Sequence, residues 1–120
     1  MYNKHQLGNS GEKLACEYLE KENYKILEKN FKCSQGEIDI IAYDINKKEI
    51  VFFEVKTRTN FNYGIPSESI NKIKKMHIKR SIEYYLYKKG FVNAFVRVDA
   101  IEIVIHNGAY KLNHIKSILE

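Results

Sequence analysis

Two adjacent segments, residues 36–44 and 49–57, restrict the fold of this chain more than any other part of its sequence. Both are rich in Val, Ile and Phe, and only four residues separate them, which is typical of a β-hairpin. A connection through Asn46-Lys47, or through residues 45–48, gives the same pairing of the two strands. This register predicts one wholly apolar face, and a shift by one residue would bury charge instead. The apolar pairs are Ile38–Val55, Ile40–Phe53 and Ala42–Val51.

The remaining segments predict a single α/β domain, residues 1–120, with elements in the order αβββαββ. A first helix ends near Lys21 and begins at Asn9 or Ser10, or earlier near Lys4. Its apolar stripe consists of Leu14, Ala15, Tyr18 and Leu19. Further strands are expected at residues 24–33, 94–105 and 109–113, and Asn107-Gly108 is a strong hairpin turn between the last two.

A long second helix is predicted over residues 67–89, with Gly90 as its stop. The residues expected to face the sheet are Ile78, Ile82, Tyr85 and Leu86. A strand, a helix and a further strand in succession predict a right-handed crossover between parallel strands. The fold class is therefore α/β, with a mixed β-sheet flanked by helices.

The net charge of +5 is concentrated in this second helix. Residues 67–90 contain seven basic residues against Glu68 and Glu83, and the charges of the remaining chain balance. A localised basic element is typical of a protein that binds a polyanion, although a solvated helix face gives the same pattern. The seven basic residues are Lys72, Lys74, Lys75, Lys79, Arg80, Lys88 and Lys89.

The sequence also predicts a cytoplasmic protein. No apolar run approaches the roughly 20 residues that a membrane-spanning helix needs. The first residues lack the apolar region of a signal peptide. Cys16 and Cys33 are isolated and form no zinc motif, and the four histidines match no metal-ligand spacing.

The second face of the predicted hairpin carries the chemistry. There Asp39 is expected opposite Glu54, and Glu37 opposite Lys56. Opposed side chains have Cβ atoms about 4.5–5.5 Å apart, so two carboxylates repel unless a cation lies between them. A hard divalent cation takes oxygen ligands, and a lysine beside it stabilises charge on a phosphate. The pattern therefore predicts a metal-dependent site built from Asp39, Glu54 and Lys56.

Ordinary structural explanations of the same pattern remain open. Glu-x-Lys is very common on strands. Glu37 and Lys56 can form a plain cross-strand ion pair, and the charged face can simply be solvated.

Four stretches of the chain resemble the YraN family of small bacterial proteins, and the resemblance covers nearly the whole chain. That family is identified as predicted endonucleases of the restriction-endonuclease-like, or PD-(D/E)XK, superfamily, which includes archaeal Holliday-junction resolvases. The resemblance implies a restriction-endonuclease-like mixed sheet. The stretches are Gly11-Glu12-Lys13-Leu14-Ala15, Gly36-Glu37-Ile38-Asp39-Ile40-Ile41-Ala42, Phe53-Glu54-Val55-Lys56-Thr57-Arg58 and Tyr63-Gly64-Ile65-Pro66.

The resemblance also implies roles for individual residues. Asp39 matches the metal-binding aspartate of the superfamily, Glu54 and Lys56 match its E-x-K, and Glu12 matches a glutamate on the first helix of many members. The expected ligands of Mg²⁺ or Mn²⁺ are Asp39, Glu54 and the Val55 carbonyl, with Glu12 helping directly or through water. The residues expected to contact backbone phosphates are Arg58, Lys72, Lys75, Lys79 and Arg80.

The resulting hypothesis is a metal-dependent endonuclease acting on branched or structured nucleic acid, with DNA preferred to RNA. A homodimer is compatible with the resemblance, because junction resolvases of this fold act as dimers, but the sequence leaves the oligomeric state open. The first alternative is a nucleic-acid-binding module with a degenerate site, and metal dependence separates it from a nuclease. The second is an assembly protein, whose binding would be indifferent to salt.

Overall fold

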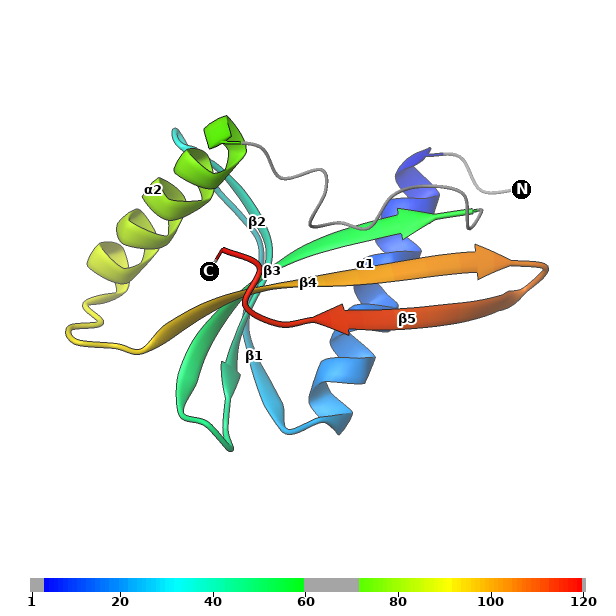
Figure 1. Cartoon of the computed structure of the whole chain (residues 1–120), viewed down its shortest axis with the longest axis horizontal. Coiled ribbons are helices and arrows are strands. Elements are labelled where there is room, and N and C mark those ends of the chain that lie inside the picture. The colour runs from blue at the N-terminus through cyan, green and yellow to red at the C-terminus, as the bar shows by residue number, and fades with distance from the viewer. Residues whose placement is uncertain (1–3, 60–71, 120) are drawn as a thin grey trace.

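A five-stranded sheet in the order β1-β2-β3-β4-β5 forms the centre of the computed structural model, which describes residues 4–59 and 72–119 (Figure 1). Helix α1 packs on one face of the sheet and helix α2 on the other. Strands β3 and β4 are parallel and are connected through α2, whereas the other neighbouring strands are antiparallel. The elements are α1 (Lys4–Lys21), β1 (Tyr24–Cys33), β2 (Gly36–Asp44), β3 (Glu49–Arg58), α2 (Lys72–Lys89), β4 (Val96–His106) and β5 (Ala109–Ile115).

The predicted order αβββαββ and the mixed sheet are confirmed. The second helix is described only from Lys72, so its predicted first residues, 67–71, lie outside the described part of the chain. Gly90 ends α2 with a φ of 72°. Asn107 and Gly108, with φ of 50° and 79°, form the expected turn between β4 and β5. Strand β4 begins at Val96, two residues later than predicted.

Each face of the sheet has its own apolar core. Ala15, Cys16 and Leu19 of α1 pack against one face, where all three side chains are buried. The sheet residues of this first cluster include Ile40, Ala42, Val51, Phe53, Ile101, Ile103 and Ile105. Under α2 the second cluster contains Phe31, Ile38, Ile41, Ile50, Phe52, Ile78, Ile82, Tyr85 and Val98. Both helices therefore bury the stripes that the sequence predicted.

The predicted register of the β2–β3 hairpin is confirmed from the pair Asp44–Glu49 to the pair Ile40–Phe53. The prediction is wrong beyond that point, because the ladder ends there and the two strands diverge (Figure 1). Asp39 and Glu54 are therefore not a directly opposed ladder pair. Ile38 likewise joins the cluster under α2 and not the predicted apolar face under α1. The divergence opens the gap in which the candidate site lies.

A close approach between α1 and β3 holds the first helix against this part of the sheet. A Cβ atom at Gly11 would lie 1.8 Å from the Thr57 Oγ1 atom, which is far inside van der Waals contact. Only glycine fits there. This contact fixes the position of α1, and with it the neighbouring Glu12, against the end of β3.

Candidate active site

A cavity of about 490 Å³ lies between the start of β2, strand β3 and the first half of α2. Asp39 and Glu54, two of the predicted metal ligands, both line it. Its other walls come from the β1–β2 turn and from α2. The remaining lining residues are Cys33, Ser34, Gln35, Gly36, Glu37, Lys74, His77, Ile78 and Ser81.

Beyond the last paired residues of β2 and β3, the Asp39 side chain accepts the hydrogen bond from β3 that a backbone carbonyl would accept in a continued strand pairing. Its Oδ2 atom accepts a hydrogen bond from the Val55 backbone N–H at 2.7 Å. Burial and the negative charges of Glu54 and Glu12 together raise the pKa of Asp39 to about 7, against the opposing effect of the hydrogen bond from the Val55 N–H. A negative charge at Asp39 is therefore costly in the protein alone, and a bound cation would relieve that cost.

Two lysines neutralise Glu54. The Lys74 Nζ atom lies 2.7 Å from Glu54 Oε1, and the Lys56 Nζ atom lies 3.4 Å from the same oxygen. Burial alone would lower the pKa of Lys74, but the hydrogen bond to Glu54 and the negative charges of Glu54 and Asp39 together outweigh burial and hold that pKa above its ordinary value. The predicted proximity of Lys56 to Glu54 is confirmed, and an ammonium group from a distant helix joins them.

Lys74 was counted in the sequence only as one charge of a basic helix. Its place in the cavity follows from helical spacing, because Lys74 lies four residues before Ile78 and seven before Ser81, both on the sheet-facing side of α2. The same face presents His77 at the cavity, where its Nδ1 atom lies 2.8 Å from the Gln35 carbonyl oxygen. These two residues are the site members that charge counting missed.

Glu12, which the resemblance implies to assist the metal directly or through water, does not line the cavity of Asp39 and Glu54. It lines a separate cavity of about 460 Å³ between α1 and β1, which also contains Lys29 and Asn30. Burial raises the pKa of Glu12, and a hydrogen bond with Asn30 opposes that rise. The charge of Glu12 contributes to the raised pKa of Asp39, although the two carboxylates line different cavities.

Among residues 4–59 and 72–119, no three His, Cys, Asp or Glu side chains are gathered as a ready-made metal centre. The donor set of Asp39 and Glu54 still suits a hard cation, because both are carboxylates at one cavity and Asp39 resists ionisation without a counter-charge. Both ammonium groups contact Glu54 Oε1, so a cation held by Glu54 would share that carboxylate with them.

The predicted phosphate-binding residues divide into two groups. Arg58 of β3 bonds through Nε to Glu102 Oε2 at 3.1 Å, so it is held in the sheet surface. The remaining four are exposed along α2 and give that helix a basic outer surface. They are Lys72, Lys75, Lys79 and Arg80.

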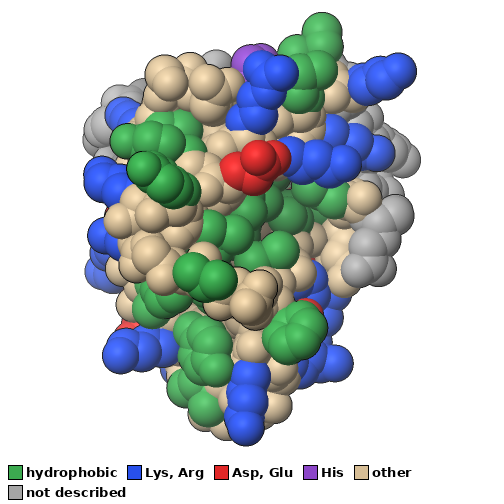
Figure 2. Space-filling model, turned by 90° about the vertical axis from the view of Figure 1, so that its left-hand side faces the viewer, with side chains coloured by type: hydrophobic (Ala, Val, Ile, Leu, Met, Phe, Trp, Pro, Cys, Tyr) green, Lys and Arg blue, Asp and Glu red, His purple; other side chains and the backbone are tan. Residues whose placement is uncertain are grey.

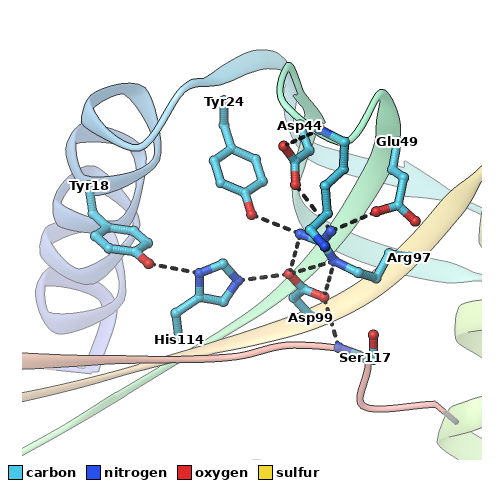
Figure 3. Close-up of polar contacts among 9 residues, drawn as sticks. Tyr18, Tyr24, Asp44, Glu49, Arg97, Asp99, His114 and Ser117 are labelled. Carbon is cyan, nitrogen blue, oxygen red and sulfur yellow. Dashed lines mark hydrogen bonds and ion pairs between the residues drawn. The ribbon is translucent and has the colours of Figure 1, made fainter.

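A second cluster of charged side chains lies away from the cavity, around Arg97 and Asp99 of β4 (Figure 3). The Arg97 guanidinium bonds to Asp99 at 2.9 Å and to Asp44 at 3.1 Å. His114 Nε2 lies 2.7 Å from Asp99 Oδ2. The other members are Tyr18, Tyr24, Glu49 and Ser117. Within the described residues every buried side-chain nitrogen and oxygen has a partner, so this cluster is a satisfied structural network.

Comparison with known proteins assigns the chain to a family. The model of "Uncharacterised protein family UPF0102" matches residues 11–103. The chain belongs to the UPF0102 family. This confirms the resemblance to the YraN family, which is the same family. The matched stretch includes the cavity residues Asp39, Glu54 and Lys74, and also Lys56 beside them.

Full-length relatives of the UPF0102 family come from several bacteria. A UPF0102 protein of Clostridium perfringens is 47% identical over 117 residues, which cover 96% of this chain and 93% of the relative. One from Caldicellulosiruptor saccharolyticus is 44% identical over 117 residues, 96% and 98% of the two chains. One from Caldanaerobacter subterraneus is 44% identical over 117 residues, 98% and 94%. None of the helices in the described part of the chain is long and apolar enough to cross a membrane.

Proposed function

We propose that this protein is a metal-dependent nuclease that hydrolyses phosphodiester bonds of nucleic acid. The observation that carries the proposal is the cavity where β2 and β3 diverge. It brings together a carboxyl group that resists ionisation, Asp39, and a second carboxylate, Glu54, with two ammonium groups beside it. Carboxylates and lysines in one cavity suit a cation and a phosphate together.

In this proposal Asp39 and Glu54 hold Mg²⁺ or Mn²⁺, with the Val55 carbonyl as a third donor and Glu12 contributing charge. The ion, when bound, supplies Lewis-acid activation of the phosphate and a more acidic bound water. Lys56 would position the attacking water as an ammonium group, or would take its proton if the side chain were first converted to the neutral amine. Lys74 provides a positive charge for the negative charge that develops on the phosphate oxygens. The exposed lysines of α2 hold the backbone of the substrate.

The test is cleavage of labelled branched, single-stranded and duplex DNA and RNA by the purified chain. We expect cleavage with Mg²⁺ or Mn²⁺, none in EDTA, and the fastest cleavage on branched or structured DNA. Equal cleavage in EDTA, or no cleavage of any substrate with either metal, would contradict a metal-dependent nuclease.

One observation favours a second candidate function, a nucleic-acid-binding module with a non-catalytic site. Lys74 already neutralises Glu54, and three ligating side chains are not gathered in the described residues. A binding module would bind nucleic acid equally well with and without a divalent metal. It would also show no change of melting temperature when the metal is added alone.

We expect Asp39→Asn to be more stable than the wild type in EDTA at pH 8. Because the pKa of Asp39 is raised, the folded state favours the protonated carboxyl. Protonation of Asp39 therefore stabilises the fold fully below about pH 4, and this stabilisation is lost as the pH rises toward 7. At pH 8 the wild type carries the unfavourable charge, which asparagine lacks. A shift of about three units corresponds to ~4 kcal/mol, and relaxation of a site open to water reduces the gain to about 1–3 kcal/mol. Denaturant unfolding of both proteins from pH 4 to pH 8 measures this difference in the free energy of unfolding.

Thermal unfolding of the same two proteins tests the metal. Mg²⁺ or Mn²⁺ should raise the melting temperature of the wild type and have a much smaller effect on Asp39→Asn, because only the wild type keeps both carboxylates. A less stable Asp39→Asn in EDTA, together with a wild type that ignores the metal, would show that Asp39 is only a hydrogen-bond acceptor for Val55.

Charge reversal on α2 tests the proposed phosphate contacts. Lys75→Glu and Lys79→Glu should each weaken binding to any sequence, and the salt slope on duplex DNA should fall by about 0.9 for each phosphate that the variant no longer neutralises. Lys21→Glu, an exposed lysine at the end of α1, is the matched control and should bind normally. Unchanged affinity in both α2 variants would place the binding surface elsewhere.

A further inference from the structure

A second cavity, of about 420 Å³, lies at the opposite end of α2 from the candidate active site. It is enclosed by β1, by the β2–β3 hairpin and by the segment that connects α2 to β4. Its volume is that of a small-ligand pocket. The lining residues are Lys25, Leu27, Tyr43, Lys48, Ile50, Phe91, Asn93, Ala94 and Phe95. We refer to it below as the aromatic cavity.

The aromatic rings of this cavity are unusually open to solvent. Phe95 is 75% exposed and Phe91 is 42% exposed, whereas Phe52 and Phe53 in the core are 1% exposed. Covering large apolar side chains on a surface with a partner lowers the free energy of the system. Figure 2 views the molecule from this side, and hydrophobic side chains there lie among Lys and Arg side chains.

The backbone that carries these rings is held in place. The Phe95 carbonyl accepts a hydrogen bond from the Ile50 N–H at 2.8 Å, and the Phe91 N–H donates to the Leu86 carbonyl at 3.0 Å. The Phe91 ring also lies against the Tyr85 ring, with centroids 6.2 Å apart. Exposed rings on a fixed backbone form a preorganised surface, which lowers the entropy lost on binding.

The charge at the cavity selects an anionic partner. Lys25 and Lys48 are both exposed, and neither is paired with a carboxylate in the described residues. Among those residues no Asp or Glu lines the cavity. Flat rings beside unpaired lysines match a nucleotide, because a base stacks on an aromatic side chain while its phosphate contacts a lysine. Asn93 adds an amide for the edge of a base.

We propose that the aromatic cavity binds a single-stranded segment of nucleic acid, with an unpaired base against Phe95 and Phe91 and its phosphates at Lys25 and Lys48. This inference rests on the proposed nuclease function and names the substrate class: nucleic acid with an unpaired segment that reaches the far end of α2 from the cleavage point. Exposed basic residues run along α2 from Lys72 at its start to Lys89 at its end. A base inside an intact duplex is stacked on its neighbours and does not reach such rings.

A second copy of the chain fits this surface less well. A two-fold interface places the same patch on both subunits, so Lys25 and Lys48 of one copy would face those of the other. Their repulsion would oppose the gain from covering the phenylalanines.

The experiment is equilibrium binding of fluorescent oligothymidylate and of a blunt duplex of equal length, both in EDTA so that cleavage does not interfere. Phe95→Ala should weaken oligothymidylate binding about tenfold, the size expected for one stacked base, and should leave duplex binding almost unchanged. Phe95→Leu should weaken oligothymidylate binding equally, since leucine keeps an apolar surface but has no ring on which a base can stack. Phe95→Trp, which keeps an aromatic ring, should bind oligothymidylate as tightly as the wild type. Lys48→Glu should lower the salt slope by about 0.7 for each phosphate that it no longer neutralises.

Tyr110→Ala is the matched control, because Tyr110 is an aromatic side chain 54% exposed on β5, outside the cavity. Its oligothymidylate affinity should equal that of the wild type. Equal affinities of Phe95→Ala and wild type would overturn the inference. So would loss of self-association, or loss of binding to anionic lipid vesicles, in Phe95→Ala without any loss of oligothymidylate binding. If Phe95→Ala weakens oligothymidylate binding as expected but the wild type shows no metal-dependent cleavage, only the nuclease proposal is contradicted.

Discussion

Glu54→Gln should lose cleavage by a factor of about a thousand or more while the protein stays folded. Glu54 is the carboxylate on which the proposed cation and both ammonium groups, Lys56 and Lys74, converge. Glutamine keeps the size of the side chain and a carbonyl oxygen that accepts a hydrogen bond from Lys74. It removes the negative charge that a metal ion requires. Single-turnover cleavage at saturating Mg²⁺ or Mn²⁺ measures the loss.

Glu28→Gln provides the matched control for this variant. Glu28 of β1 also pairs with a lysine, Lys89, at 3.6 Å, but it lies outside the candidate active site. We expect its cleavage rate to equal that of the wild type. If Glu54→Gln cleaves as fast as Glu28→Gln, the cavity between β2 and β3 is not the active site, and the observed cleavage comes from another site or a contaminant.

Arg97→Met should destabilise the fold by about 3–5 kcal/mol at pH 7, enough to unfold many domains of this size. Its guanidinium is the counter-charge of Asp99, which is fully buried, and of Asp44, which is 4% exposed. Methionine fills similar space but leaves both carboxylates inside the protein without a cation. Denaturant unfolding of the two proteins gives the difference in free energy.

The pH dependence of Arg97→Met distinguishes lost charge pairing from poor packing. In the wild type, burial disfavours ionised Asp99, but the hydrogen bonds from His114, Arg97 and the Ser117 N–H and the charge of Arg97 together outweigh burial and hold its pKa below the ordinary value. That stabilisation is present above about pH 4 and is lost at lower pH. Without Arg97 the buried carboxyls of Asp44 and Asp99 should favour protonation. Lowering the pH from 7 to 5 should therefore reduce the difference in the free energy of unfolding between the variant and the wild type.

If the difference in the free energy of unfolding between Arg97→Met and the wild type stays constant between pH 7 and pH 5, Arg97 stabilises the fold by packing alone. Arg80→Met is the matched control, since Arg80 is exposed on α2. It should change stability by no more than about 0.5 kcal/mol at either pH.

The amino-acid sequence alone determined the order of the helices and strands and the register of the β2–β3 hairpin next to its turn. The strands of residues 24–33 and 36–44 have the predicted bounds, and the register from Ile40–Phe53 to Asp44–Glu49 follows from apolar alternation. These features depend on contacts between residues close along the chain, and a slipped register would bury charge. The same pattern identified Asp39 and Glu54 as residues of one site.

Only the tertiary structure decided which side chains complete that site and which hold the fold. The divergence of β2 and β3 replaces a ladder bond by the Asp39–Val55 bond, and the packing angle of α2 brings Lys74 to Glu54. The Arg97 network joins Tyr24 and Asp44 to β4 across 73 and 53 residues of sequence.

Such partners leave no periodic signal in a single sequence, because what selects them is the cost of burying an unpaired charge, which appears only once distant elements pack. The exposure of Phe95 was decided in the same way. Its sequence neighbours predicted a strand, and the start of β4 at Val96 leaves the ring outside both cores.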